Sequence, residues 1–474
     1  MASIIISKVG ERKGTHRIWF EGEKLSRAGF DTGSRYRVDT SKPDRLILIK
    51  TKTEERSRVV SGRKRGGRSR PIIDLNNKAL GKLFSVNDKL RIVIRRNKVV
   101  IRLHRLIGEI AKRFERFRQA ITEKRPLAVH SHYHGGGVLD SAIHSGLAMA
   151  GVGSYVQVAI EKERDYLDTS LRQNPELFTD ESILIEGGIE DVKPCNSVPF
   201  DVLVCGLPCV AFSNAGKAKM RDLRGGKRTF LPEESDTAGA LFFYTLRHII
   251  DAGENGPGII IIECVPGLVN SASMAVIRTV LTHAGFTLQE RILGGNEFGA
   301  LEDRQRVCVV AVSNGLEDVV DLGDVPALSI KPKTLSEVLE SVPDDSDMWS
   351  EMPYLAAKEI RDKEQGKGFL RQLFDGSEEK IGVVTRLYQK RRSTDPMIRH
   401  PSNPALSRLL TPAEHCAVKS IPSKQIDDDS MSNKLKHEIL GQSVIFPAFE
   451  AVGYAIGRQL RSAFGEPATT PVAA

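Results

Sequence analysis

From Leu127 onward, short apolar runs typical of buried strands alternate with stretches of helical periodicity. The strand-like runs cover residues 128–130, 155–160, 201–205, 258–263 and 306–312. Strands that alternate with helices favour a sheet covered by helices on both faces, because each crossover helix must pack back onto the sheet. The sequence therefore predicts a doubly wound, Rossmann-like α/β sheet as the main domain.

Charge is distributed very unevenly along the 474 residues, whose net charge is +9. Residues 1–125 contain 34 Lys and Arg against 13 Asp and Glu, a net charge of +21, so the remainder has a net charge of −12. Such asymmetry predicts that the front of the chain binds a polyanion. The densest basic run spans residues 63–70, and Arg63, Lys64 and Arg65 are its predicted nucleic-acid contacts.

Two segments of this basic region, about 15–50 and 70–103, read as copies of one unit. With a one-residue gap, Leu25 pairs with Leu80 and Gly33 with Asn87. Each copy predicts a strand, a short helical turn, a Gly or Asn turn and two further strands, and two such units would close one small β barrel. The pattern resembles the swapped-hairpin domains of AbrB-type and SymE-type proteins, many of which bind DNA. A plain dimerisation barrel is the alternative.

A cysteine follows one of the buried strands. Residues 206–217 read Gly-Leu-Pro-Cys-Val-Ala-Phe-Ser-Asn-Ala-Gly-Lys, which places Cys209 just beyond the carboxyl end of the strand. Open α/β sheets build their active sites at that edge. The six cysteines include no CxxC pair, so the sequence predicts neither disulfides nor a zinc site. Cys209 is the predicted nucleophile.

The GxPCxxFSxAG pattern resembles the nucleophile motif of the DNA (cytosine-5) methyltransferase family. Seven further motifs of that family, some before and some after this one, are present in the family's order, so that the resemblance spans residues from about 127 to 462. It implies an S-adenosylmethionine-dependent methyltransferase fold, S-adenosylmethionine as cofactor and duplex DNA as substrate. It also implies that Cys209 adds to C6 of a cytosine flipped out of the duplex.

A glycine-rich turn after the first strand predicts a nucleotide-like cofactor. Gly135 and Gly137 let the backbone approach the ligand, and Glu161 ends the second strand, where it is placed to bind ribose hydroxyls. Tyr133 matches the aromatic position of the family's cofactor motif. The resemblance adds further cofactor-binding positions, namely Ile189, Pro208, Leu241, Gln442, Ser443 and Val444.

Three charged residues complete the predicted catalytic set. Glu263 ends a fully apolar strand, where desolvation should raise its pKa and make it a useful acid toward the pyrimidine N3. Residues 302–306 resemble the family's QxRxR motif. The resemblance implies that Arg306 holds the cytosine O2 and that Arg304 braces the nucleophile loop and a backbone phosphate.

Four positions depart from the family's pattern. Val138 stands where a glycine is usual, and Gly188 stands where an acid contacts adenine. Cys264 replaces an asparagine that shapes the active site, and Glu302 replaces the glutamine of QxRxR. These departures prompt an alternative, namely a catalytically impaired DNA-binding or regulatory homologue. A second alternative is an RNA (tRNA) cytosine-5 methyltransferase, which uses the same chemistry.

The motif positions also predict a division into segments. The expectation is a basic β-rich domain at 1–103, a linker helix at 104–126, a catalytic domain at 127–314, a target recognition domain at 315–405, catalytic motifs again at 406–462 and a disordered tail at 463–474. Predicted DNA contacts are Lys217, Lys219, Arg221 and Arg224 after the nucleophile, and Lys390, Arg391 and Arg392 in the insert.

The predicted function is sequence-specific methylation of C5 of cytosine in duplex DNA. A separate cognate restriction endonuclease is a conceivable partner, and the chain is expected to be a monomer or a dimer through its N-terminal domain. No apolar run approaches the roughly 20 residues of a membrane span, and no secretion signal is recognisable. A cytoplasmic location is therefore expected.

Overall fold

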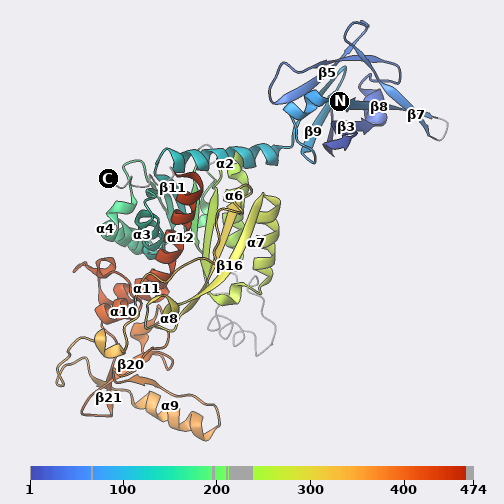
Figure 1. Cartoon of the computed structure of the whole chain (residues 1–474). Helices are drawn as coiled ribbons and strands as arrows, with labels where there is room; N and C mark the ends of the chain where they lie inside the picture. Colours follow the sequence, from blue (N-terminus) through green and yellow to red (C-terminus); the bar gives the residue numbers. More distant parts are fainter. Residues whose placement is uncertain (1, 66–67, 195–197, 210–211, 213–238, 466–474) are drawn as a thin grey trace, which may run out of the picture. The chain divides into compact units, whose positions relative to one another are not determined.

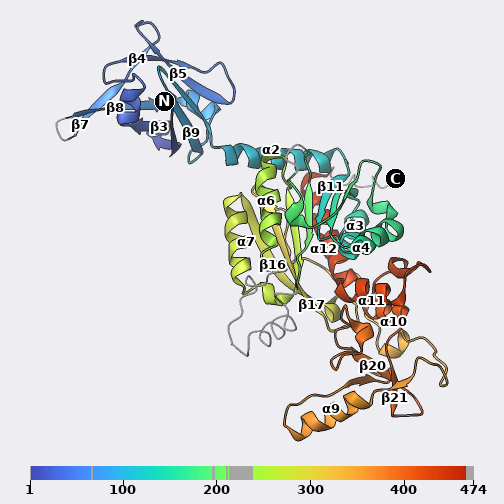
Figure 2. The ribbon, with the colours of Figure 1, turned by 180° about the vertical axis from the view of Figure 1, so that it is seen from behind.

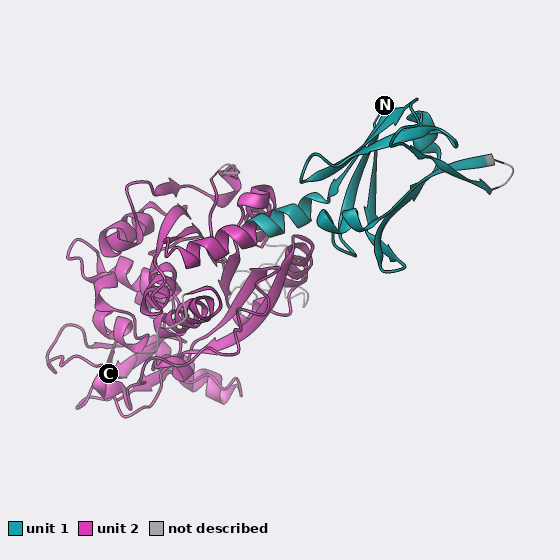
Figure 3. Ribbon diagram, turned by 45° about the horizontal axis from the view of Figure 1, so that its top comes forward, with its two compact units in different colours: residues 1–112 teal, residues 113–474 magenta. Residues whose placement is uncertain are grey.

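The computed structural model describes residues 2–65, 68–194, 198–209, 212 and 239–465. It divides into two compact units, residues 1–112 and 113–474 (Figure 3). Helix α2 (Arg105–Thr122) begins in unit 1 and ends in unit 2, within the segment predicted as a linker helix. In unit 2, Phe117 of this helix is buried in the main core, the apolar cluster that also contains the strand residues Val204 and Ile261. Arg116 donates a hydrogen bond to the Phe200 carbonyl at 2.9 Å.

Unit 1 consists of two antiparallel sheets around one core. The first has the order β1-β9-β10-β5-β4-β6 and the second β2-β3-β8-β7. Their bounds are β1 (Ser3–Lys8), β2 (Gly10–Arg12), β3 (Thr15–Glu21), β4 (Arg35–Asp39), β5 (Arg45–Thr51), β6 (Arg58–Val59), β7 (Ser61–Arg65), β8 (Arg68–Asn76), β9 (Lys89–Arg95) and β10 (Lys98–Leu103). Only Val9 separates β1 from β2, and only Val60 separates β6 from β7, so the chain passes from one sheet to the other at both edges.

The two segments predicted to be copies have the same order of elements. The first runs β3, α1 (Glu23–Arg27), β4, β5, and the second runs β8, the 3-10 turn η1 (Lys78–Lys82), β9, β10. The equivalent Leu25 and Leu80 are both buried. Gly33 has φ 86° and Asn87 has φ 73°, the left-handed conformation that glycine and asparagine tolerate best. The copies interlock, because β3 pairs with β8 and β5 pairs with β10.

Unit 2 is built on a seven-stranded sheet of order β13-β12-β11-β14-β15-β17-β16. Strands β11 (Leu127–His132), β12 (Ser154–Glu161), β13 (Ile183–Glu186), β14 (Val202–Gly206) and β15 (Ile259–Cys264) are parallel. Strands β16 (Phe286–Gly294) and β17 (Gln305–Ser313) are antiparallel to their neighbours. The predicted α/β fold is confirmed. Sequence reasoning missed β13 and β16 because their residues are mostly exposed or half-buried and form no continuous apolar run.

Helices cover both faces of this sheet (Figures 1 and 2). Alternate strand residues such as Val204 and Ile261 face α3 (Val138–Met149) and α12 (Phe446–Phe464). Their neighbours Leu203 and Ile260 face α6 (Phe242–Ala252) and α7 (Ala272–His283). The remaining helices and turns around the sheet are α4 (Arg164–Gln173), α8 (Gly295–Phe298), η2 (Pro175–Leu177), η3 (Ile189–Asp191), η5 (Gly253–Asn255) and η6 (Pro266–Leu268).

Helix α12 returns the end of the described chain to the start of the sheet. A Cβ added at Gly453 would lie 2.4 Å from the Ile143 carbonyl oxygen, and one added at Gly146 would lie 2.0 Å from the Glu450 carbonyl oxygen. Only glycine permits two helices to approach so closely. Ser145 also donates to Glu450 at 2.6 Å. The helix that follows the glycine-rich turn is therefore clamped by the last helix.

The segment predicted as an insert has a small sheet and core of its own. Its sheet order is β18-β21-β20-β19, with β18 (Ser350–Glu351), β19 (Gln372–Phe374), β20 (Pro396–Arg399) and β21 (Leu406–Arg408). Helices and turns here and in the segment that follows are η7 (Leu335–Glu337), α9 (Pro353–Glu364), η8 (Tyr388–Lys390), α10 (Pro412–Val418), η9 (Ser423–Ile426) and α11 (Asn433–Gln442). Leu301, from beside the main sheet, lies in the same apolar cluster as Tyr388 and Ile398 and so joins this region to the sheet.

Within the described part of the chain, no single helix is both long and apolar enough to cross a membrane. The bent pair α11 and α12 meets the length and composition test only when the two helices are taken together.

Candidate active site

Strand register brings three predicted catalytic residues to one edge of the sheet. Gly206 at the end of β14 lies beside Glu263 at the end of β15, because the two strands are parallel. Strand β17 runs the opposite way, so it starts at this edge, and its second residue is Arg306. Cys209 follows Gly206 by three residues. A Cβ on Gly206 would lie 3.9 Å from Glu263 Oε2, so the glycine leaves room for the carboxylate.

Cys209 differs from the other cysteines of the described ranges. Cys205, Cys264, Cys308 and Cys416 are buried, whereas Cys209 is only partly buried. Burial raises the pKa of the Cys416 thiol to about 12, and it raises the pKa values of Cys205, Cys264 and Cys308 further still. Thiols with such pKa values are inert, because only the thiolate attacks an electrophile. Cys209 is thus the best-placed nucleophile among them.

Glu263 and Arg306 form a buried pair. Arg306 Nε lies 2.6 Å from Glu263 Oε1, and both residues are less than 10% exposed. Burial raises the pKa of Glu263, and the charges of Arg306 and Arg304 only partly oppose that rise. The Glu263 carbonyl accepts a hydrogen bond from Leu207 N–H at 3.0 Å, which ties the carboxylate's strand to the start of the nucleophile segment. The raised pKa favours the protonated form of this carboxyl group more than in an exposed glutamate.

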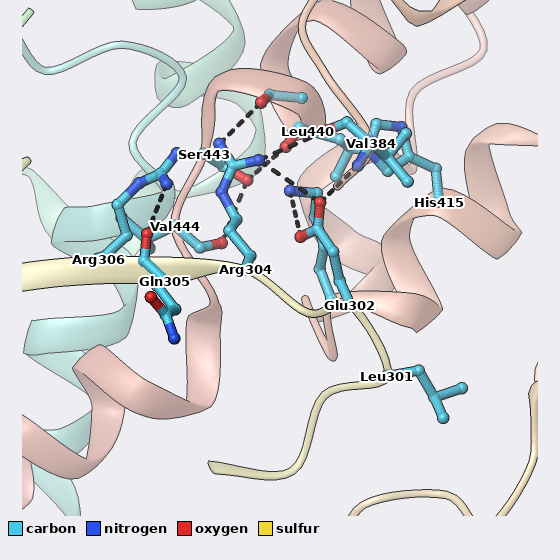
Figure 4. Close-up of polar contacts among 12 residues, drawn as sticks. Leu301, Glu302, Arg304, Gln305, Arg306, Val384, His415, Leu440, Ser443 and Val444 are labelled. Carbon is cyan, nitrogen blue, oxygen red and sulfur yellow. Dashed lines mark hydrogen bonds and ion pairs between the residues drawn. The ribbon is translucent and has the colours of Figure 1, made fainter. Parts of the chain in front are cut away.

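Arg304 lies in a buried polar network rather than at the surface (Figure 4). Its guanidinium donates to the Gly441 carbonyl at 3.0 Å and lies 3.4 Å from Glu302 Oε1. Arg304 is 3% exposed, so a contact with a DNA phosphate would require the side chain to leave this network. The geometry favours a bracing role toward the C-terminal end of α11, which contains Gly441.

Glu302, which replaces the family's glutamine, has a buried cationic partner that sequence reasoning missed. Lys419 Nζ lies 2.8 Å from Glu302 Oε2, and both side chains are fully buried. Glu302 Oε1 also accepts from Val384 N–H at 2.7 Å (Figure 4). Burial would raise the pKa of Glu302, but Lys419 and Arg304 hold it below its ordinary value. Burial and the nearby Arg304 lower the pKa of Lys419 to about 7.

The glycine-rich turn is fastened to the second strand by Glu161. Gly135 N–H donates to Glu161 Oε2 at 2.8 Å, and Glu163 N–H donates to Oε1 at 2.9 Å. Each carboxylate oxygen retains a second acceptor position for a ligand hydroxyl. Gly135 and Gly137 have φ values of 59° and 81°, which favour glycine. No atom lies within 4 Å of a Cβ built on Gly135, so the space above the turn is open.

Three predicted cofactor residues share one apolar cluster. Tyr133, Ile189 and Leu241 pack together with Val158 and Ile160. Tyr133 Oη donates to the Leu241 carbonyl at 2.9 Å, which joins the first strand to the start of α6. Pro208, beside the nucleophile, is half-buried. These residues form a wall of the kind that an adenine ring requires.

The other predicted cofactor residues connect α11 to α12. Ser443 Oγ donates to the Leu440 carbonyl at 2.7 Å, and Val444 is buried in the main core. Gln442 Nε2 is buried and has no hydrogen-bond partner among the described residues. An unsatisfied buried amide indicates that a further polar group completes this position.

The remaining departures from the family's pattern are accommodated locally. Val138 begins α3 and is buried in the main core. A Cβ on Gly188 would lie 2.7 Å from Glu190 Oε1, so the Glu190 carboxylate occupies the space beside the position where the family carries its acid. Cys264 Sγ–H points at the Leu207 carbonyl at 3.8 Å, where it supports the start of the nucleophile segment.

Sequence reasoning also missed a buried polar chain beneath the glycine-rich turn. His134 lies 2.9 Å from Ser131 Oγ through Nδ1 and 2.7 Å from Ser170 Oγ through Nε2. Ser131 Oγ in turn donates to Asp140 Oδ2 at 2.8 Å. The contacts join β11, α3 and α4, so they fix the turn from below. The only signal in the sequence was the presence of His134 and Asp140 in an otherwise apolar region.

The predicted DNA contacts have mixed outcomes. Lys217, Lys219, Arg221 and Arg224 lie outside the described residues. Lys390 and Arg392 are exposed, whereas Arg391 is half-buried and donates to Ser350 Oγ at 2.7 Å. In unit 1, Arg63 and Lys64 are both exposed, and Arg63 forms an ion pair with Glu21 at 3.1 Å. Of Arg65 only the backbone is described.

The Glu302–Lys419 pair generates a stability prediction. Glu302→Gln and Lys419→Met should each lower the free energy of unfolding of unit 2 by about 3 kcal/mol, because each removes the partner closest to a fully buried charge. The double variant should lose less than either single variant. Urea unfolding followed by Trp349 fluorescence in a Trp19→Phe background measures this. If the loss of unfolding free energy in the double variant equals the sum of the losses in the two single variants, the two side chains do not interact.

Comparison with known proteins agrees with this geometry. The family model described as C-5 cytosine-specific DNA methylase matches residues 141–458. Type II methyltransferase M.Eco47II of Escherichia coli is 27% identical over 310 residues, which cover 58% of this chain and 67% of that protein. Type II methyltransferase M.SsoII of Shigella sonnei is 26% identical over 277 residues, which cover 57% and 67% of the two chains.

Solved structures show the same fold. The Dnmt2 methyltransferase of S. pombe superposes with a TM-score of 0.53 at 17% identity, covering 72% of this chain and 99% of that one. The Entamoeba histolytica methyltransferase EhMeth gives a TM-score of 0.51 at 18% identity, covering 72% and 100%. Since the family model matches well over half of the sequence, the chain belongs to the C-5 cytosine-specific DNA methylase family and is a DNA (cytosine-5) methyltransferase.

Proposed function

We propose that Cys209, Glu263 and Arg306 carry out the methylation of cytosine C5. The single observation that carries this assignment is the register of β14, β15 and β17, which brings the three residues to one edge of the sheet. C5 of cytosine is a poor nucleophile. Addition of the Cys209 thiolate at C6 would place an electron pair at C5, while the protonated Glu263 relieves charge at N3.

Arg306 orients this acid. Its guanidinium holds Glu263 at 2.6 Å, so the carboxyl group has a fixed direction when a base enters. The remaining N–H groups of Arg306 can donate to the cytosine O2. After methyl transfer, loss of the C5 proton returns an electron pair to the ring, the Cys209–C6 bond breaks, and the thiolate is regenerated.

Members of this family use S-adenosylmethionine, which supplies an electrophilic methyl group when bound. The described residues fit such a ligand. Glu161 offers free acceptor positions, Tyr133, Ile189 and Leu241 form an apolar wall, and the space above Gly135 is open. The unsatisfied amide of Gln442 adds a polar group to the residues that we assign to cofactor binding.

Glu190 is our candidate for the missing adenine contact. Its carboxylate lies beside Gly188, where the family pattern has an acid, and Ile189 between them belongs to the cofactor wall. Glu190 is itself exposed and is therefore accessible to a ligand. A carboxylate displaced by two positions along the chain can accept the same amine hydrogen bond.

The other parts of the chain have proposed roles in DNA binding. We assign target recognition to the insert at 315–405, where Lys390 and Arg392 are exposed. The basic unit 1, including Arg63, Lys64 and Arg65, adds affinity for duplex DNA through its charge. The proposal also keeps the likeness of unit 1 to AbrB-type and SymE-type domains, a cognate restriction endonuclease that acts separately, and a chain that is either a monomer or a dimer through unit 1.

The covalent step is tested by Cys209→Ser. The variant should lose methyl transfer from labelled S-adenosylmethionine to duplex DNA by at least about a thousandfold, because a hydroxyl is a far weaker nucleophile. Its affinity for DNA should persist. Bisulfite sequencing of the wild-type product identifies the modified cytosine. Transfer to tRNA but not to DNA, in a parallel reaction, would replace DNA by RNA as the substrate.

The acid role of Glu263 is tested by Glu263→Gln. We expect kcat to fall by about 10²- to 10³-fold, the usual contribution of a positioned acid. Because the pKa of Glu263 is raised, the wild-type kcat should stay high above the ordinary carboxyl range and fall as the pH rises through the folded pKa. The glutamine variant should lack that fall. An identical pH profile for both proteins would exclude proton donation by Glu263.

The adenine contact is tested by Glu190→Ala, with Glu181→Ala as a control that removes an exposed carboxylate nearby in sequence. Loss of one charged hydrogen bond should weaken S-adenosylmethionine binding about tenfold. Calorimetric titration in the absence of DNA measures the dissociation constant directly. Equal affinities for the two variants would remove Glu190 from the cofactor site.

A further inference from the structure

The first sheet of unit 1 presents one face to its core and one outward. Inward residues such as Leu48, Val99 and Ile94 are directly opposite one another and buried. Residues one position away in each strand lie on the other face, because strand side chains alternate. The register of β1, β9, β10, β5 and β4 therefore fixes which residues share the outward face.

Two basic rows cross this outward face. The Arg102 row consists of Arg45, Arg102 and Arg91, which are directly opposite one another on β5, β10 and β9. The Lys98 row consists of Arg37, Lys98 and Arg95, on β4, β10 and β9, with Ile49 of β5 between Arg37 and Lys98.

An apolar stripe separates the two rows. It consists of Ile47, Val100, Val93 and Ile4, which are again directly opposite one another. Ile4 is 50% exposed, Ile47 and Val100 are half-buried, and Val93 is buried. The stripe ends at Asp39 on β4, which is opposite Ile47. Asp39 is the one acidic residue among the two basic rows and the stripe.

The basic rows are poorly compensated within the protein. Arg37, Arg91, Arg95 and Arg102 form no ion pair with any residue that the structure describes, whereas Arg45 pairs with Asp44 at 2.7 Å. Like charges directly opposite one another destabilise a sheet. Three adjacent arginines therefore lower the stability of unit 1 unless an anionic ligand covers them.

We propose that this face binds duplex DNA in the major groove, with the Arg102 row on one phosphate backbone and the Lys98 row on the other. Four residues of β10 separate the rows, which is about 14 Å at the usual strand rise. The major groove is about 12 Å wide. Branched apolar side chains in the stripe suit contact with thymine methyl groups.

Charge decides between DNA and a second copy of the chain as occupant. Two copies paired face to face would oppose one set of basic rows with another, and among the described residues of this face only Asp39 and Asp44 would offset the repulsion. Duplex DNA instead offers two phosphate rows and an interior with methyl groups. The inference rests on the proposed role of unit 1 in DNA binding and is independent of the chemistry of Cys209.

Two triple variants of the full chain test this face. One is Arg45→Ala/Arg91→Ala/Arg102→Ala, and the other is Arg37→Ala/Arg95→Ala/Lys98→Ala. The matched control is Lys24→Ala/Lys78→Ala/Lys82→Ala, which removes three exposed lysines from the helical turns of the same unit. Fluorescence anisotropy of a labelled 40-bp duplex measures binding over a range of salt concentrations.

Each row variant should bind DNA at least about tenfold more weakly than the control, and the slope of log affinity against log salt should fall by about 2 to 3. Two separate rows keep the test valid if one variant fails to fold. Row variants that bind as tightly as the control would overturn the proposal. The proposal would also be overturned if only the variant Arg63→Ala/Lys64→Ala/Arg70→Ala lost DNA affinity. That result would place the DNA contact on β7 and β8. Cys209→Ser should bind DNA with the affinity of the wild type. The binding measurement therefore tests this face even if the catalytic assignment of Cys209 is wrong.

Discussion

The active site depends on the directions of three neighbouring strands. Because β14 and β15 are parallel and β17 runs against them, two strand ends and one strand start meet at one edge. Cys209, Glu263 and Arg306, to which we assign the catalytic roles, thereby come from positions up to nearly a hundred residues apart. Any slip of register in β15 would turn Glu263 to the other face of the sheet and separate it from Arg306.

The buried charges around the candidate active site come in compensated sets. Arg306 faces Glu263, and Glu302 is shared by Lys419 and Arg304. A buried carboxylate in place of a neutral amide is tolerable because Lys419, at the C-terminal cap of α10, meets it. The departures at Gly188 and Cys264 follow the same logic, since a neighbouring side chain or the new thiol itself fills the space. Each of these deviations is thus accompanied by a local change of contact partners.

Motif order in the sequence predicted the main fold, and it singled out residues that the strand register brings to one edge of the sheet; their catalytic roles stay a prediction. Cys209, Glu263 and Arg306 were recognisable because each adjoins a continuous apolar strand. Lys419 and Glu190 were not, because their significance lies in contacts with Glu302 and Gly188 that only the folded chain reveals. Strand β16 was not predicted for a related reason. Its half-exposed face breaks the apolar run on which strand prediction depends. The outward face of unit 1 likewise requires strand register, which repeat detection alone does not supply.

The clamp between α3 and α12 has a consequence for how the enzyme is made. Proteins leave the ribosome from the N-terminus, and domains begin to fold as they emerge. Residues 127–149 therefore appear about three hundred residues before Gly453, which must seat against Ile143. Until then the apolar face of α3 lacks its cover, and the loop that contains Ser443 and Val444 has no fixed place. The nascent chain can form its sheet early, but the segment with Ser443 and Val444 takes its place beside the sheet only after α12 has been synthesised.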